Sequence, residues 1–183
     1  MEFKKSIPNY LTIFRIILIP ILIISFYFDG PVGHWTAAII FIFASITDYF
    51  DGFFARKYNA HSSFGKMFDP IADKLLVAAT LMMLVHLDRA PVIPAILILC
   101  REIVVSGLRE YLAQFKISVP VSKLAKIKTA IQMIAIITLL LGEKVIGLPG
   151  MDILGTISLW IAAALTLVTG YAYLKVGLSK TGI

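Results

Sequence analysis

Long runs of apolar residues divide the chain, and short polar stretches separate them. Each run approaches or reaches the roughly 17 to 25 residues that a helix needs to cross a bilayer. The runs are too continuous to be the apolar stripes of amphipathic helices on a soluble core. We therefore expect an all-α integral membrane protein with six transmembrane helices, over residues 11–28, 35–55, 67–87, 91–111, 127–141 and 153–174.

The start of the chain predicts one further element. Phe3, Ile7 and Tyr10 can share one face of a short interfacial helix that lies on the membrane before the first span. The first run contains Arg15 and has no small-x-small cleavage site, which favours a retained helix over a signal peptide. Because the connections are too short for another folded unit, we expect residues 1–183 to form a single membrane domain.

Composition agrees with this interpretation. Apolar residues make up 59% of the chain and charged residues 15%, with a mean hydropathy of +0.90, which excludes an ordinary soluble domain. Aromatic residues near the span ends predict interfacial anchors. These are Trp35, Trp160, Tyr171 and Tyr173.

Basic residues fall mostly on one side of the predicted spans. Eleven lie on the side of the two termini and only two, Arg89 and Lys144, on the other. The positive-inside rule then places both termini and the connection between the second and third spans in the cytoplasm. Topology and anionic lipid explain the net charge of +6, so we expect no nucleic-acid partner.

Aspartates interrupt the second and third runs at helical spacing. Asp48 and Asp51 share one helix face with Gly52, Ala55 and Arg56. Gly65, Asp69 and Asp73 share a face of the next helix. Residues 57–63 form the turn between them, and Pro70 either follows an N-cap at Asp69 or kinks a helix that began near Ser63. An acidic side chain at the centre of a membrane helix costs about 2.5 to 3.5 kcal/mol, so four of them predict a specific role.

The residue types indicate which role. All four candidate ligands are carboxylates, which favours a hard ion such as Mg²⁺ or Mn²⁺, and four carboxylates suit two ions. Two-metal sites characteristically act on phosphoryl groups. The small residues leave room for a large ligand, and Arg56 suits a phosphate. The residues alone therefore predict a metal-dependent site for a diphosphate-containing substrate at the inner membrane surface.

Other interpretations compete with this one. The small residues alone are typical of helix packing, and single aspartates can pair with Arg56, Lys57 or Lys74. A divalent-cation transporter would also need acids, but it would distribute them through the membrane depth. Here they gather at one end of the spans, beside an arginine that repels cations.

The pattern of Asp48-x-x-Asp51-Gly52-x-x-Ala55-Arg56, an eight-residue spacer, then Gly65-x-x-x-Asp69-x-x-x-Asp73 resembles the signature of the CDP-alcohol phosphotransferases. The resemblance covers essentially the whole chain. It implies an enzyme that transfers a phosphatidyl group from CDP-diacylglycerol to an alcohol and releases CMP. It also implies that Asp48, Asp51 and Asp69 are metal ligands. Asp73 is implied to be the general base and a further metal contact.

The same resemblance implies where the CDP-lipid binds. Gly52, Ala55 and Gly65 would lie against the nucleotide, and Arg56 would bind its phosphates. Asn9 and Thr12, with Arg15, are expected to frame the nucleotide or the lipid headgroup, although capping of the first helix explains Asn9 and Thr12 almost as well. The resemblance further suggests a homodimer.

Three other stretches resemble the bacterial branch of the family that uses glycerol-3-phosphate as acceptor, which implies the bacterial inner membrane. They are Ile7–Pro20, Arg101–Glu110 and Lys126–Gln132. An acceptor with its own phosphate needs a basic cluster, and the candidates are Arg101, Arg109, Lys126 and Lys128. Alternatively, the arginines pair with Glu102 and Glu110 and the lysines only mark topology. Inositol phosphate and then phosphatidylglycerol are the alternative acceptors.

Overall fold

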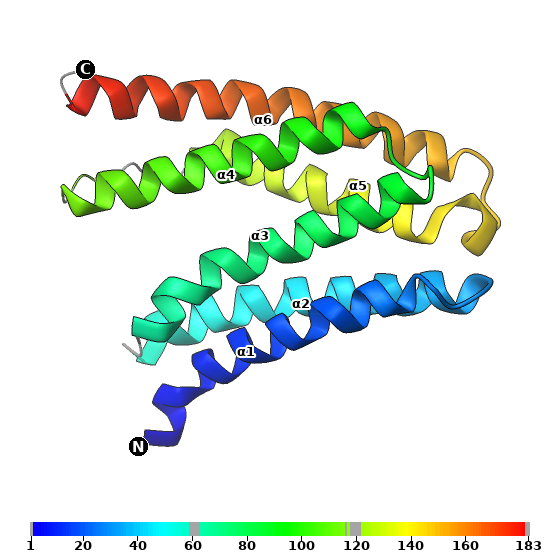
Figure 1. The fold of residues 1–183 in the computed structure, drawn as a ribbon, viewed down its shortest axis with the longest axis horizontal. Helices are drawn as coiled ribbons and strands as arrows, with labels where there is room; N and C mark the ends of the chain where they lie inside the picture. The colour runs from blue at the N-terminus through cyan, green and yellow to red at the C-terminus, as the bar shows by residue number, and fades with distance from the viewer. Residues whose placement is uncertain (1, 59–62, 116, 118–121, 182–183) are drawn as a thin grey trace. The chain divides into compact units, whose positions relative to one another are not determined.

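The computed structural model describes the backbone of residues 2–58, 63–115, 117 and 122–181. Within these ranges, the side chains of residues 2–8, 49–58, 63–64, 66, 178, 180 and 181 are not described. The described residues form six helices and no strand (Figure 1). The helices are α1 (Glu2–Ser25), α2 (Pro31–Tyr58), α3 (Ser63–His86), α4 (Val92–Gln114), α5 (Lys123–Ile146) and α6 (Met151–Thr181).

The all-α prediction is confirmed, and each predicted span overlaps one helix, although the first span was predicted to run to residue 28 and α1 ends at Ser25. Residues 2–25 form one continuous helix, so the predicted interfacial segment is the first part of α1 and not a separate element. Pro70 lies inside α3, which begins at Ser63, so Asp69 is not an N-cap. Four residues of the predicted turn, 59–62, lie outside the described residues.

Two helices are long and apolar enough to cross a membrane by themselves, among the residues that the structure describes. They are α5 and residues Met151–Gly177 of α6, and residues Asn9–Ser25 of α1 form a shorter apolar helix. Large apolar side chains such as Ile17, Ile103 and Ile153 lie exposed on the helix surfaces. A bilayer would cover side chains that water would leave unfavourably exposed, so the helices indicate a membrane protein.

The chain divides into two compact units. The first consists of Met1–Met83 with Lys144–Gly147, and the second of Leu84–Glu143 with Leu148–Ile183. In the first unit, α1 packs against α2. Leu18 and Leu22 of α1, and Ala37, Phe41 and Ala44 of α2, are all buried. The alanines let the two helix backbones approach closely, which is the usual basis of helix association in membranes.

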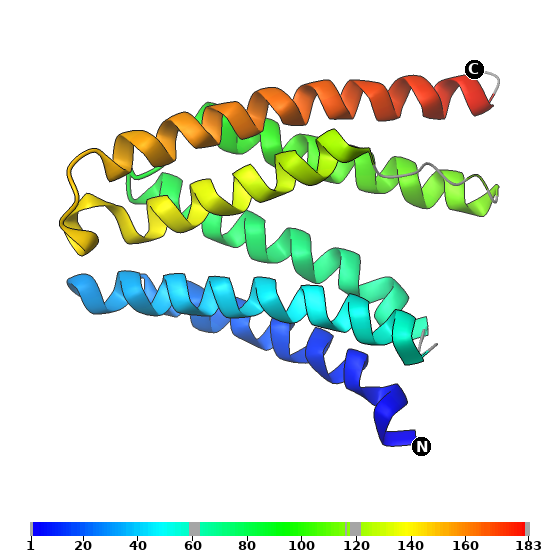
Figure 2. The same cartoon turned by 180° about the vertical axis from the view of Figure 1, so that it is seen from behind.

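In the second unit, α4 and α6 lie side by side and run in the same direction. α5 runs in the opposite direction to α6 (Figure 2). Small residues again line the contacts. A Cβ atom on Gly155 of α6 would lie 2.8 Å from the side chain of Leu139, and one on Gly170 would lie 3.0 Å from Cγ of Arg101. The glycines therefore give α4 and α5 a close approach to α6.

α5 bends near its end at Gly142, which has φ 60° and ψ 176°. The apolar run predicted a helix only to residue 141, one residue before this bend. Arg89, from the α3–α4 turn, donates from Nη1 to the carbonyl oxygen of Leu140 at 3.2 Å. Its Nη2 lies 3.7 Å from Oδ1 of Asp152 at the start of α6. The guanidinium group thus connects the bend in α5 to the α3–α4 turn and to the start of α6, all within the second unit.

Candidate active site

The predicted aspartates lie on α2 and α3 of the first unit. The backbone of both segments is helical, so the expected helical spacing of the signature is confirmed. Asp48, Asp69 and Asp73 have described side chains, and all three are partly exposed. Gly65 is buried in the first turn of α3. The side chains at four further predicted positions lie outside the described residues; they are Asp51, Gly52, Ala55 and Arg56.

A buried arginine of α1 joins the aspartates of α2 and α3. Arg15 has no solvent-exposed surface. Its Nη1 atom lies 2.9 Å from Oδ1 of Asp73 and 3.3 Å from Oδ1 of Asp48. Two carboxylate oxygens from different helices are therefore held at one nitrogen. The sequence interpretation placed Arg15 beside the nucleotide or headgroup and did not predict these ion pairs.

Thr12 lies one turn before Arg15 on α1 and reaches the third aspartate. Its hydroxyl is fully buried and donates a hydrogen bond to Oδ1 of Asp69. Asn9, another turn earlier, is half-buried. The face of α1 that carries Thr12 and Arg15 thus meets all three described aspartates. A buried arginine in an apolar run was the signal in the sequence, because such a cation requires a partner.

The chemistry of these donors fits a hard divalent ion. Carboxylate oxygens are the ligands that Mg²⁺ and Mn²⁺ prefer, and no softer ligand type takes part in the described cluster. The described side chains alone do not form a group of three that could hold a metal. Asp51, the fourth acid, lies outside them, and the Arg15 guanidinium contacts two of the three that are described.

A second polar cluster lies in the second unit. Oε1 of Glu102 accepts a hydrogen bond from Nη1 of Arg101 at 2.9 Å and another from Nζ of Lys128. Lys128 is only 2% exposed. Nη2 of Arg101 donates to Oγ1 of Thr169 on α6 at 3.1 Å. The contact between Arg101 and Glu102 is the ion pair that the structural alternative predicted.

Arg109 is held differently. Its Nη2 donates to the hydroxyl of Tyr173 at 2.8 Å, and its guanidinium carbon lies 5.1 Å from the centre of that ring. The guanidinium of Arg101 lies 5.9 Å from the same ring centre. Tyr173 is 5% exposed, so its prediction as an interfacial anchor was wrong. Its ring can hold two cations because the face of an aromatic ring is negative.

The structure therefore gathers three of the four predicted acceptor residues. Arg101 and Lys128 meet at Glu102, and Arg101 and Arg109 meet at Tyr173. Lys126 is exposed, two residues before the buried Lys128 on α5. Nε of Arg101 is buried without a hydrogen-bond partner among the described atoms. A buried donor of this kind is suited to a ligand or a water molecule.

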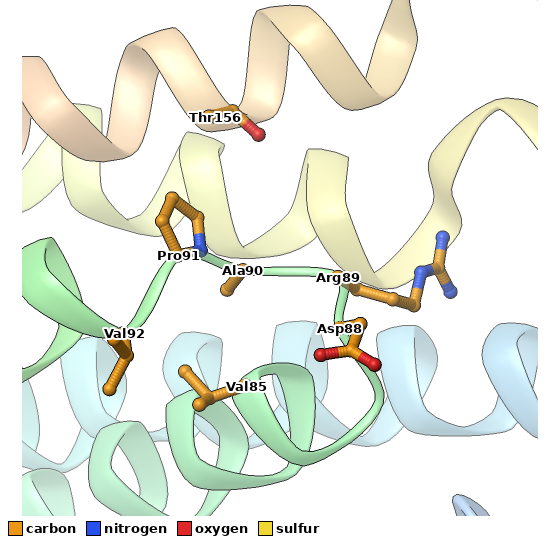
Figure 3. Close-up of a pocket in the computed structure, with 7 residues that line it drawn as sticks. All are labelled: Val85, Asp88, Arg89, Ala90, Pro91, Val92 and Thr156. Atoms are coloured by element: carbon orange, nitrogen blue, oxygen red, sulfur yellow. The ribbon is translucent and has the colours of Figure 1, made fainter.

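A separate pocket opens at the α3–α4 turn, with a volume of about 430 Å³ (Figure 3). The side chain of Arg89 points away from Thr156 and Pro91 at this pocket. None of the residues that line it was predicted for the site. They are Val85, Asp88, Arg89, Ala90, Pro91, Val92 and Thr156.

Comparison with known proteins assigns the family. The family model described as CDP-alcohol phosphatidyltransferase matches residues 5–168. The chain belongs to this family. The match includes the aspartate signature and the Arg101–Glu102–Lys128 contacts, whereas Thr169 and Tyr173 lie after its last residue, 168.

Curated relatives extend the similarity to nearly the full chain. A protein of Rickettsia felis is 55% identical, over 96% of this chain and 97% of its own length. A Bacillus subtilis protein is 43% identical, over 92% of this chain and 93% of its own. Both relatives are named CDP-diacylglycerol–glycerol-3-phosphate 3-phosphatidyltransferase. The predicted membership of the CDP-alcohol family is thus confirmed.

Proposed function

We propose that this chain transfers the phosphatidyl group of CDP-diacylglycerol to glycerol-3-phosphate, which yields phosphatidylglycerophosphate and CMP. The observation that carries the proposal is the similarity to relatives that bear the name of this activity. The basic cluster around Arg101, Arg109 and Lys128 supports an acceptor that has its own phosphate.

The reaction makes one bond and breaks one. A hydroxyl oxygen of the acceptor attacks the β-phosphorus of CDP-diacylglycerol, and the bond from that phosphorus to the bridging oxygen breaks as CMP leaves. A hydroxyl is a weak nucleophile until a base takes its proton, which is the role that we assign to Asp73. The position of Asp73 beside Arg15, at 2.9 Å, supports a carboxylate that is held in one orientation.

Four aspartates would hold two divalent ions, Mg²⁺ or Mn²⁺. They are Asp48, Asp51, Asp69 and Asp73. When bound, such ions neutralise the diphosphate and stabilise the leaving group. Arg15 and Thr12 orient three of these carboxylates from α1, which supports a preformed ligand set. In our proposal Gly52, Ala55 and Gly65 lie against the nucleotide, Arg56 binds its phosphates, and Asn9 helps to frame the headgroup.

The acceptor phosphate is assigned to the second cluster. Arg101, Arg109 and Lys128 supply charged donors, and the exposed Lys126 adds a cation at the same end of α5. A phosphate monoester carries about 1.5 to 2 negative charges at neutral pH, so it needs several such donors. Serine or choline would not use them.

We further propose that all six helices cross the bacterial inner membrane. Both termini and the active site would face the cytoplasm. The distribution of eleven basic residues against two supports this topology. The family match through residues 5–168 supports one domain, and the family resemblance supports a homodimer.

CMP release by the purified protein in detergent, with Mg²⁺ and CDP-diacylglycerol, tests the proposal. Glycerol-3-phosphate, inositol phosphate, phosphatidylglycerol and serine are offered one at a time, with and without EDTA. We expect turnover with glycerol-3-phosphate alone and none with EDTA. Turnover with inositol phosphate instead would agree with the proposed transfer reaction and with a basic cluster that binds a phosphate, but it would show that glycerol-3-phosphate is not the acceptor. Turnover with serine or phosphatidylglycerol alone would refute the acceptor assignment.

A further inference from the structure

A single carboxylate joins two of the cations assigned to the acceptor. Oε1 of Glu102 accepts hydrogen bonds from Arg101 of its own helix and from Lys128 of α5. Glu102 is itself mostly buried, with 22% of its side chain exposed. The two cations are 11% and 3% exposed by the same measure. All three charges are therefore largely withdrawn from solvent.

Two buried cations that both bond to the same carboxylate oxygen would repel each other if the carboxylate were absent. Removing charges from water is costly, and an unpaired buried charge is far more costly than a paired one. Screening is weak in such an environment, so both the repulsion and the attraction to Glu102 are strong. The directions of the Arg101 and Lys128 side chains consequently depend on Glu102.

Helix α6 supplies the other supports of the cluster. Thr169 accepts from Nη2 of Arg101, and its own hydroxyl donates to the carbonyl oxygen of Leu165 at 2.8 Å. Tyr173 accepts from Nη2 of Arg109 and places its ring beside both arginines. Each arginine is thus held by a hydroxyl oxygen of α6, and not only by a bound substrate. Nε of Arg101 still has no partner among the described atoms and remains available as a donor.

The charge of the cluster matches a phosphate. Arg101, Arg109 and Lys128 carry three positive charges, and Glu102 cancels one of them. The remaining two positive charges, from which the exposed Lys126 is left out, equal the full charge of a phosphate monoester dianion. Glu102 therefore has two effects, because it orients two donors and also adjusts the total charge to that of one phosphate.

We propose that Glu102 is a positioning residue of the acceptor site, which holds Arg101 and Lys128 in the arrangement that binds the acceptor's phosphate. Tyr173 does the same for Arg109. The inference rests on the proposed function, because it specifies how the site assigned to glycerol-3-phosphate is built. It assigns no contact between Glu102 and the substrate.

The test compares steady-state kinetics of the wild type, Glu102→Gln, Glu102→Asp and Tyr173→Phe, as full-length protein in detergent with Mg²⁺. KM is measured for glycerol-3-phosphate and separately for CDP-diacylglycerol. Glu110→Gln is the control, because it removes the same charge from an exposed residue of the same helix. Thermal unfolding of every variant is recorded alongside.

We expect Glu102→Gln to raise KM for glycerol-3-phosphate about tenfold or more, the effect of losing a charged hydrogen bond. KM for CDP-diacylglycerol stays within about twofold of the wild type. Glu102→Asp keeps the charge on a shorter side chain. Its KM for glycerol-3-phosphate should lie between the values for the wild type and for Glu102→Gln. Tyr173→Phe keeps the ring and raises KM for glycerol-3-phosphate by a smaller factor, and Glu110→Gln leaves both KM values unchanged.

If Glu102 only stabilises the fold, the KM values and unfolding temperatures should change in a different way. Equal changes in both KM values, or a lower unfolding temperature with unchanged KM for glycerol-3-phosphate, would overturn the inference. If Glu102→Gln does not fold, Glu102→Asp decides by the same criterion. The wild-type measurement separates the two hypotheses. Without wild-type turnover on glycerol-3-phosphate the proposed function fails, whereas wild-type turnover with no selective KM effect refutes only the role of Glu102.

Discussion

Nη1 of Arg15 lies 2.9 Å from Oδ1 of Asp73, and the same nitrogen lies 3.3 Å from Oδ1 of Asp48. The arginine comes from α1, and the aspartates come from α3 and α2. Arg15 is completely buried, whereas the aspartate side chains are 41% and 43% exposed. The cation therefore approaches the carboxylates from the protein interior, and their other sides remain accessible for ligands.

Replacing Arg15 should make the first unit depend on metal for its stability. In Arg15→Met, Asp48 and Asp73 lose a shared counter-charge, which we expect to cost about 1 to 3 kcal/mol, because they are hydrogen-bonded charged groups. Divalent ions can supply the missing positive charge, so the loss should be larger in EDTA than in excess Mg²⁺. Thermal unfolding in detergent under both conditions measures the difference.

Arg89→Met is the matched control, because Arg89 pairs with Asp152 and not with the site aspartates. It should destabilise the protein equally with and without Mg²⁺. An Arg15→Met protein whose unfolding temperature does not respond to Mg²⁺ would contradict a metal-binding role for the carboxylates that Arg15 contacts.

Asp73→Asn should abolish catalysis without preventing CDP-lipid binding. An amide cannot take the acceptor proton, so we expect kcat to fall about 10²- to 10⁴-fold, the usual contribution of a general base. Activity is measured as CMP release at saturating substrates, and binding as the effect of CDP-diacylglycerol on the unfolding temperature. Asp88→Asn, in the exposed α3–α4 turn, should be as active as the wild type. More than a tenth of wild-type kcat in Asp73→Asn would exclude Asp73 as the base.

The helices could be predicted because each one depends on residues that are close together in the sequence. A run of apolar residues predicts a membrane helix wherever it packs, and the aspartate spacing predicts which side chains share a face. The predicted helices differ from the observed ones at their first and last residues. α5 begins at Lys123, four residues before the predicted start, because polar residues extend a helix beyond its apolar run.

The contacts between helices were not predictable in the same way. Whether Arg15 meets the aspartates depends on the rotation of α1 about its axis, which its own sequence does not determine. The same holds for Tyr173. Its position near the end of a span predicted an interfacial anchor, but whether its side chain is exposed depends on the rotation of α6. Arg109 was considered as a partner of Glu110, but its described partner is Tyr173 on α6. These partners are far apart in the sequence, since 58 positions separate Arg15 from Asp73 and 64 separate Arg109 from Tyr173.

Lys128 and Lys126 should differ in how strongly their replacement raises KM for glycerol-3-phosphate, although both were predicted to bind the acceptor phosphate. Lys128 is buried and bonded to Glu102, whereas Lys126 is exposed. We expect Lys128→Met to raise KM for glycerol-3-phosphate about tenfold or more, and Lys126→Met to raise it about two- to threefold, because exposed charges act weakly. KM for both variants is measured at a fixed, saturating CDP-diacylglycerol concentration. Equal effects would show that burial beside Glu102 is irrelevant to acceptor binding.

Gly142→Ala should damage the fold of the second unit but not its acceptor chemistry. The glycine has φ 60° and ψ 176°, a conformation that costs other residues about 1 to 3 kcal/mol. An added Cβ would also overlap Nη2 of Arg89 and lie 2.6 Å from Oδ1 of Asp152, so the Arg89–Asp152 contact would have to separate. We expect a clearly lower unfolding temperature in detergent, with KM for glycerol-3-phosphate in the folded fraction unchanged.

Gly107→Ala provides the control for this prediction. Gly107 lies within α4, and an added Cβ there has no atom within 4 Å. Because alanine has the higher helix propensity, this substitution should leave the unfolding temperature unchanged or raise it slightly. If Gly142→Ala were as stable as Gly107→Ala, the bend in α5 would not be held by Arg89. A selective rise in KM for glycerol-3-phosphate would instead link the bend to the acceptor site.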